Sequence, residues 1–217
     1  MKKEFNGDST MQIHLVLELI GTMAFAVSGA IIGIQKKMDI FGVAILGLTT
    51  AVGGGVLRDL ILNITPPAAF RNPVFAITAV AVSIITFFKP TQFSVEKTGR
   101  VYEKMLLIMD SVGLGLFTVI GIQVAKASSD ATNLFMETFV GVLTGVGGGL
   151  LRDIFAGYTP SIFVKHFYAC ASIVGAWLCV LLWPYSGSNV SMFIGAVSIV
   201  LLRLVAAHYR WSLPKAK

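Results

Sequence analysis

Seven apolar stretches dominate this sequence, and each has about the length that a helix needs to cross a membrane. A helix requires about 20 apolar residues to span the hydrocarbon core of a bilayer. The stretches cover residues 12–34, 40–62, 71–88, 104–124, 133–156, 162–183 and 188–209. Only short polar segments separate them, so no room is left for a soluble domain. The pattern predicts an all-α integral membrane protein with seven transmembrane helices.

The composition excludes a water-soluble globular protein. Of the 217 residues, 55% are hydrophobic and only 13% are charged, whereas a soluble domain carries roughly 25% charged residues. The formal charge of +6 does not indicate a nucleic-acid partner, because membrane proteins collect excess lysine and arginine in cytoplasmic loops. Cys170 and Cys179 lie about 13 Å apart along one predicted helix, which is too far for a disulfide.

The sequence contains an internal repeat. Segment 51–60, AVGGGVLRDL, returns as segment 145–154, GVGGGLLRDI, 94 residues later. Each unit holds three predicted spans, so the second unit enters the membrane inverted. Inverted repeats are typical of transporters, with the pathway at the interface between repeats. We therefore expect one three-helix unit over 12–88, an inverted unit over 104–183, and a seventh helix over 188–209 outside the repeat.

The glycine triplets of the repeat have two interpretations. Small residues recur at every fourth position around each triplet, a spacing that lets membrane helices pack closely. Alternatively, each triplet kinks or unwinds its helix, and the freed carbonyl groups line a cation path, since exposed backbone must face protein or water. Both interpretations apply to the same six residues: Gly53, Gly54, Gly55, Gly147, Gly148 and Gly149.

An arginine–aspartate pair follows each triplet: Arg58–Asp59 in the first unit and Arg152–Asp153 in the second. Ionisable residues inside spans are costly and normally face the bundle interior or water. Each pair therefore either clamps a helix end or forms an electrostatic gate at one mouth of a water-filled path. Adjacent residues point about 100° apart on a helix, so each arginine need not pair with its own aspartate.

Other polar and aromatic residues are weaker candidates. Asp110 lies deep within an apolar span, and we expect it to be hydrated or paired with arginine. Glu18 and Glu137 lie near helix ends, where we expect them to be solvated. A Phe-x-x-x-Gly pattern also recurs, at an offset of 92 residues, and its members either pack or form a pore constriction: Phe25 and Gly29, then Phe117 and Gly121.

The distribution of basic residues predicts the orientation, because lysine and arginine favour the cytoplasmic side. Four lie on the side of the N-terminus: Lys2, Lys3, Arg71 and Lys126. Ten lie on the opposite side: Lys36, Lys37, Lys89, Lys97, Arg100, Lys104, Lys165, Arg210, Lys215 and Lys217. We expect a multi-pass protein of the cell inner (plasma) membrane, with its N-terminus outside and its C-terminus in the cytoplasm.

With GGG-x-x-R-D twice in seven predicted spans, the sequence resembles the trimeric intracellular cation (TRIC) channel family. It is most similar to the prokaryotic branch, also labelled a putative glycine transporter domain family, and the resemblance covers about residues 12–209. It implies a homotrimer in membrane lipid in which each subunit carries its own pore for monovalent cations, chiefly K⁺. In that family the first, second, fourth and fifth spans line the pore, and the triplets kink the second and fifth.

The resemblance leaves some properties aside. Animal members have a lysine-bearing signature and bind phosphoinositide, but here Arg58 and Arg152 occupy the basic positions. Phosphoinositide regulation and a counter-ion role at calcium stores therefore do not carry over. We expect K⁺ or Na⁺ as the permeating ion, no cofactor and no metal site. Soluble-enzyme motifs are missing from the sequence, so we expect no catalysis. A secondary transporter for a small solute such as glycine, or a structural membrane scaffold, remains an alternative.

Overall fold

The computed structural model describes residues 7–88, 95–128, 133–164 and 167–211, and these residues form helices joined by short connections, with no strand among them. The basic residues Lys2, Lys3, Lys89, Lys165, Lys215 and Lys217, used for the predicted orientation, lie outside the described residues. The helices are α1 (Gly7–Gln35), α2 (Ile40–Ile61), α3 (Ala68–Arg71), α4 (Val74–Phe88), α5 (Val95–Ser128), α6 (Leu134–Phe155), α7 (Ser161–Val164) and α8 (Tyr168–His208).

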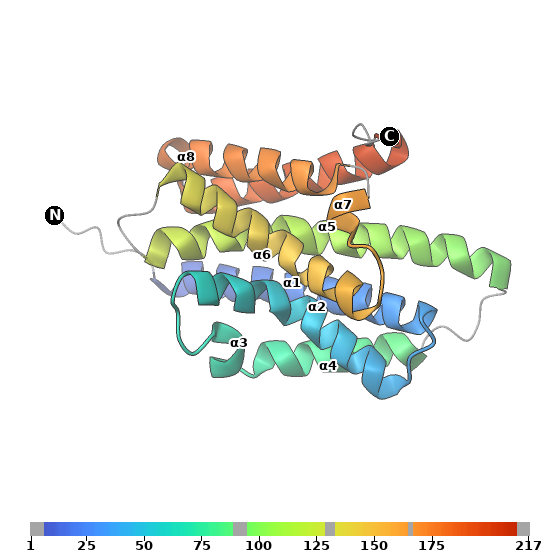
Figure 1. The fold of residues 1–217 in the computed structure, drawn as a ribbon. Coiled ribbons are helices and arrows are strands. Elements are labelled where there is room, and N and C mark those ends of the chain that lie inside the picture. The colour runs from blue at the N-terminus through green and yellow to red at the C-terminus, as the bar shows by residue number, and fades with distance from the viewer. Residues whose placement is uncertain (1–6, 89–94, 129–132, 165–166, 212–217) are drawn as a thin grey trace.

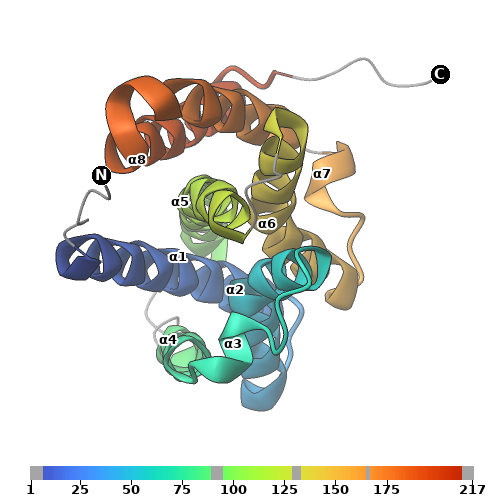
Figure 2. The same ribbon diagram turned by 90° about the vertical axis from the view of Figure 1, so that its left-hand side faces the viewer.

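The long helices lie side by side in one bundle and run back and forth along it (Figure 1). Viewed along the bundle, α5 occupies the centre, with α1, α6 and α8 around it (Figure 2). The short helices α3 and α7 lie toward opposite ends of the bundle (Figure 1). Each follows the Arg–Asp pair of one sequence unit, so the two pairs also lie toward opposite ends.

Within the described part of the chain, five helices are long and apolar enough to cross a membrane: α1, α2, α5, α6 and α8. α4 is apolar but has only 15 residues, fewer than the roughly 20 that a span requires. The predicted third span, 71–88, is therefore too long at its start. Residues 71–73 form the corner between α3 and α4, where the side chain of Asn72 accepts a hydrogen bond from the backbone N–H of Val74 (3.2 Å).

The predicted sixth and seventh spans are joined in α8, whose 41 residues would extend about 60 Å if straight, twice the thickness of the hydrocarbon core. Gly187, with φ of 75° and ψ of 170°, interrupts the helical backbone. The chain then folds back, because Gly175 lies against Ile199 and against the carbonyl oxygen of Gly195. The two parts of α8 before and after Gly187 thus pack against each other, and the polar segment 184–189 is mostly helical rather than a loop. Residues 162–164 of the predicted sixth span belong to α7.

The outer surface of the bundle is apolar. Large side chains are exposed around it, including Phe41, Phe135, Phe163 and Phe193, each at least 70% exposed. A soluble monomer rarely exposes apolar patches larger than a few hundred Å². Together with the apolar helices, this surface identifies a helical membrane protein.

Candidate functional site

α2 and α6 cross at their glycine triplets with their backbones in contact. A methyl group added to Gly54 would overlap the carbonyl oxygen of Thr144, and one added to Gly148 would overlap the carbonyl oxygen of Thr50. Both helices remain helical through the triplets, so neither contains the unwound turn of our second interpretation. The geometry supports close packing, and the role of the triplets in ion conduction stays a prediction.

The three glycines of each triplet have different neighbours. The first contacts a leucine of the opposite helix: Leu151 for Gly53 and Leu57 for Gly147. The second forms the crossing just described. The third differs between the units: a methyl group at Gly55 would lie 3.8 Å from the nearest atom, Nη2 of Arg58, whereas one at Gly149 would lie only 2.7 Å from the hydroxyl oxygen of Tyr168 and 3.6 Å from Nη2 of Arg152. Close packing explains the first two positions and Gly149, whereas Gly55 leaves room beside an arginine.

Contacts between the two sequence units are reciprocal. Gly21 lies against Phe117, and Gly113 lies against Phe25, both pairs in matching positions of the repeat. The rings of Phe25 and Phe117 are buried and stack on each other, with centroids 5.3 Å apart and an angle of 13° between the planes. Reciprocal contacts of this kind arise when two like units are related by a two-fold axis. The aromatic stack lies at the centre of that arrangement.

The remaining residues of the Phe-x-x-x-Gly pattern allow the first two helices of each unit to pack closely. A methyl group at Gly29 would lie 2.7 Å from Cα of Gly47, and one at Gly121 would lie 2.9 Å from Cα of Gly141. Because backbone atoms cannot withdraw as a flexible side chain can, both positions require glycine. Nothing in these contacts opens toward a path, so Gly29 and Gly121 as pore-lining residues stay a prediction.

Each arginine pairs with its own aspartate after all. Nε of Arg58 donates to Oδ1 of Asp59 at 2.8 Å, and Nε of Arg152 donates to Oδ1 of Asp153 at 2.9 Å. The other oxygen of each carboxylate accepts a backbone N–H from the chain beyond the helix, from Ala68 in the first unit and from Ser161 in the second, both at 2.7 Å. The aspartates thus tie the ends of α2 and α6 to α3 and α7, as the clamp interpretation requires.

At the end of the bundle near α7, Arg152 belongs to a larger buried cluster. Its Nη1 donates to Oδ1 of Asp110 at 2.6 Å and also to Oγ of Ser28. Nη2 of Arg203 lies 3.7 Å from Oδ2 of Asp110. We call Asp110, Arg152, Asp153 and Arg203 the α6 cluster. It contains two acidic and two basic side chains, all at most 4% exposed, and the predicted pairing of Asp110 with arginine is confirmed.

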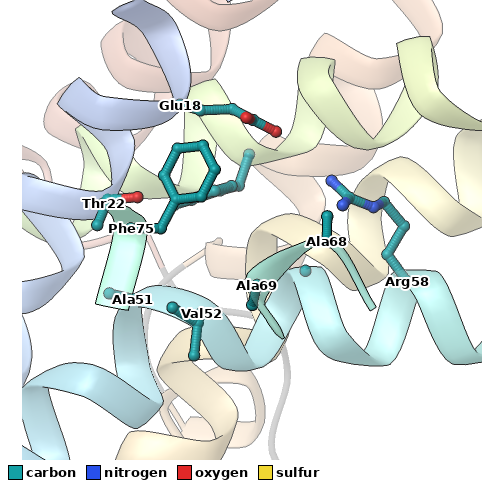
Figure 3. A pocket seen from close by; sticks show the side chains of 10 residues that line it. Glu18, Thr22, Ala51, Val52, Arg58, Ala68, Ala69 and Phe75 are labelled. Atoms are coloured by element: carbon teal, nitrogen blue, oxygen red, sulfur yellow. The ribbon is translucent and has the colours of Figure 1, made fainter. Parts of the chain in front are cut away.

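At the opposite end, near α3, the corresponding place is an open pocket. Its lining includes Glu18 and Thr22 of α1, Arg58 of α2 and Phe117 of α5. Figure 3 shows the carboxylate of Glu18 and the guanidinium of Arg58 pointing into the same space. The pocket continues outward into a wider hollow that His14, Arg71 and Asn72 also line.

Sequence reasoning missed Glu18. Its position on α1 matches that of Asp110 on α5, at the same offset of 92 residues that relates Phe25 to Phe117. We name Glu18, Arg58 and Asp59 the α2 cluster, since it repeats the acidic residue, the arginine and the aspartate of the α6 cluster. Glu137 was also misjudged, because it is only 6% exposed and its Oε2 lies 2.6 Å from Nζ of Lys126. Within the described residues, no group of three or more His, Cys, Asp or Glu side chains could hold a metal ion.

Comparisons with known proteins agree with this geometry. The sequence model of the family described as "Glycine transporter" matches residues 15–90 and again 107–184, one match in each unit. The inner membrane protein YadS of Escherichia coli (strain K12) is 35% identical over 201 residues, covering 91% of this chain and 93% of YadS.

Solved structures also match. The TRIC trimeric intracellular cation channel orthologue from Rhodobacter sphaeroides is 30% identical, with a TM-score of 0.83 over 91% of this chain and 98% of that one. A TRIC cation channel solved to explain conductance is 34% identical, with a TM-score of 0.79 over 93% of this chain and 96% of that one. The matched units, the paired triplets and these relatives together show that the chain belongs to the prokaryotic branch of the TRIC channel family.

Proposed function

We propose that the chain forms a channel for monovalent cations, chiefly K⁺, and that each subunit of a homotrimer carries its own pore between α1, α2, α5 and α6. The observation that carries the proposal is one continuous face of α1. On it, His14, Glu18 and Thr22 line the pocket, Phe25 joins the aromatic stack, and Ser28 contacts Arg152. Their spacing of three or four residues places them on one side of a helix. The face therefore connects the open pocket, through the stack, to the α6 cluster.

The structure corresponds to a closed pore under this proposal. The stacked rings of Phe25 and Phe117 fill the middle of the path, and the α6 cluster occupies its far end. Conduction requires the rings to part and the Asp110–Arg152 pair to separate, so that water and cations reach both ends. Arg58, Asp59, Arg152 and Asp153 then act at the two ends of the path, where their charges affect which ions enter.

We further propose seven membrane-crossing segments, with α8 supplying two and α4 supplying the short third. The two units then have opposite orientations in the membrane, because each contains three crossings. The excess of basic residues supports an orientation with the C-terminal ends of α1 and α4 in the cytoplasm and the pocket beside α3 outside. In this arrangement the α6 cluster faces the cytoplasm.

The homotrimer is proposed from the relatives. The Rhodobacter sphaeroides relative is described as trimeric, and the apolar outer surface of the present chain is suited to contact both lipid and neighbouring subunits. The alternative of glycine transport rests on the description of the matching family model. The solved relatives at 30% and 34% identity are described as cation channels, so we favour the channel.

Single-channel recording from purified protein in planar bilayers tests the proposal. With a KCl gradient across the bilayer, we expect discrete currents whose reversal potential lies near that of K⁺ rather than Cl⁻. Asp110→Asn should raise the open probability, because it removes the charge that pairs with Arg152 across the proposed path. Saturable glycine uptake into proteoliposomes, without such currents, would establish the transporter instead.

A further inference from the structure

The two charged clusters contain matching residues in different arrangements. In the α6 cluster, Asp110 contacts Arg152 at 2.6 Å. In the α2 cluster, the matching residues are Glu18 and Arg58, yet within the described residues no ion pair within 4.0 Å joins them. Both side chains nevertheless line one pocket and point into the same space (Figure 3). The same molecule thus contains a formed ion pair, Asp110–Arg152, and a matching pair of residues, Glu18 and Arg58, that are separated.

We propose that Glu18 is a gating residue that closes the second end of the pore by pairing with Arg58, as Asp110 closes the first end by pairing with Arg152. The inference rests on the proposed channel function, since it assigns a second gate to the same path. In this structure the gate beside α3 is open and the gate beside α7 is closed.

The orientation of Arg58 suits this role. Its Nε is held by Asp59, as the Nε of Arg152 is held by Asp153. In the α6 cluster, this arrangement directs Nη1 of the arginine toward Asp110, while Nη2 lies 2.8 Å from Oδ1 of Asp153. The same arrangement at Arg58 directs its Nη atoms toward the pocket that Glu18 lines, although Arg58 is only 4% exposed. The guanidinium is thus already oriented for the pairing.

Differences between the units explain why only one pair is made. Ser28 accepts a hydrogen bond from Arg152, but the matching position in the second unit, 92 residues later, is the apolar Ile120, so Arg58 gains no such partner. Arg203 lies on the segment outside the repeat, with its Nη2 3.7 Å from Oδ2 of Asp110. Arg71 lines the wider hollow beside Glu18, but within the described residues no ion pair within 4.0 Å joins the two. The α6 cluster is therefore held by additional contacts that the α2 cluster lacks.

The energetics of the parted pair favour a reversible gate. Glu18 is only partly buried and keeps part of its hydration, whereas Arg58 is already buried beside Asp59. Bringing Glu18 to Arg58 therefore loses hydration of the carboxylate while it gains Coulomb attraction. These two contributions nearly cancel for many ion pairs. When the free energies of the paired and separated states are similar, both states are populated, as gating requires.

Zero-length cross-linking tests the pairing without any need for ion flux. Arg58→Lys keeps the positive charge and supplies a primary amine, which a water-soluble carbodiimide joins to a nearby carboxylate as an amide. We expect mass spectrometry to find a link between positions 18 and 58 that accumulates with time. Arg152→Lys is the matched reference, because Asp110 already lies beside position 152 and its link requires no movement of the two residues toward each other. Formation of the 110–152 link without any 18–58 link would overturn the proposal, whatever the currents show.

Single-channel recording supplies the second measurement. Glu18→Gln should raise the open probability by about fivefold, corresponding to about 1 kcal/mol of lost closed-state stabilisation, while the unitary current changes little. Glu103→Gln, on an exposed glutamate near the start of α5, is the control and should leave both quantities unchanged. A lower unitary current with unchanged open probability would make Glu18 a fixed charge of the vestibule and contradict gating. An 18–58 link in a protein that conducts no ions would refute the channel but retain the pairing.

Discussion

The crossing of α2 and α6 allows a sharp comparison within one glycine triplet. Gly54 and Gly55 are adjacent in α2, and alanine at either position improves helix propensity by about 1 kcal/mol. At Gly55 the added methyl group has room, since the nearest atom is Nη2 of Arg58 at 3.8 Å. At Gly54 it overlaps the carbonyl oxygen of Thr144, a backbone atom that moves only if α6 moves. The same change thus meets free space at one position and a packed backbone at the next.

The expected difference follows from these contacts. Overpacking of a tight site costs about 1–3 kcal/mol, which offsets or exceeds the gain in helix propensity. Gly55→Ala should therefore raise the thermal unfolding temperature of the purified protein in detergent, and Gly54→Ala should give a lower unfolding temperature than Gly55→Ala. Gly148→Ala should resemble Gly54→Ala, because Gly148 lies against the carbonyl oxygen of Thr50.

A double-mutant cycle adds a test of the shared crossing. The first alanine moves α2 away from α6, so the methyl group of the second alanine overlaps the opposite backbone less. The combined Gly54→Ala and Gly148→Ala variant should therefore lose less stability than the sum of the two single losses. Equal unfolding temperatures for Gly54→Ala and Gly55→Ala, or strictly additive losses in the cycle, would refute backbone contact at the triplets.

Three further predictions concern the charged cluster, the topology and the assembly. Asp110→Asn should lower the free energy of unfolding by about 1.5–3 kcal/mol, because it replaces one of the two carboxylates paired with the buried Arg152; an unchanged unfolding temperature would contradict the cluster. A cysteine introduced by Ser186→Cys should react with a membrane-impermeant maleimide from outside intact cells, and one introduced by Gln35→Cys should react only after permeabilisation. The reverse pattern would invert the proposed orientation. Native mass spectrometry in mild detergent should give three subunits, and a stable dimer would argue against the proposed trimer.

Much of the fold could be predicted from the repeat. Segments 51–60 and 145–154 are so alike that α2 and α6 were expected to match, and both have 22 residues with equivalent ends. Even their first turns correspond, since Asp39 and Asn133 accept hydrogen bonds from backbone N–H groups three residues later. Side-chain acceptors at this position stabilise a helix start in either sequence. Where the same residue types recur at a fixed offset, the helix ends of one unit therefore predict those of the other.

The limits of that prediction have physical causes. Apolar length alone does not reveal that helical hydrogen bonding continues past Pro184 and is interrupted only at Gly187, so the joined form of α8 was missed. Glu18 was judged by its nearness to a helix end rather than by its offset from Asp110, although the offset was available in the sequence. The contact of Ser28 with Arg152 joins residues 124 positions apart, and the sequence around either residue does not predict it.

The two units share the motif that forms the charged clusters, but they differ in the residues that surround each cluster. Two identical units related by a two-fold axis would carry the same charged cluster in the same state at both ends, because every contact would recur. Here the replacement of Ser28 by Ile120 at the matching position, and the presence of Arg203 on the added segment, stabilise one cluster alone. The last segment of α8 is thus more than an addition to the bundle, because it supplies the charge that makes the two ends unequal. Under the proposed channel function, a pore of this kind can be closed at one end while the other end stays open to water, and the residues that make the two ends differ lie outside the GGG-x-x-R-D motif.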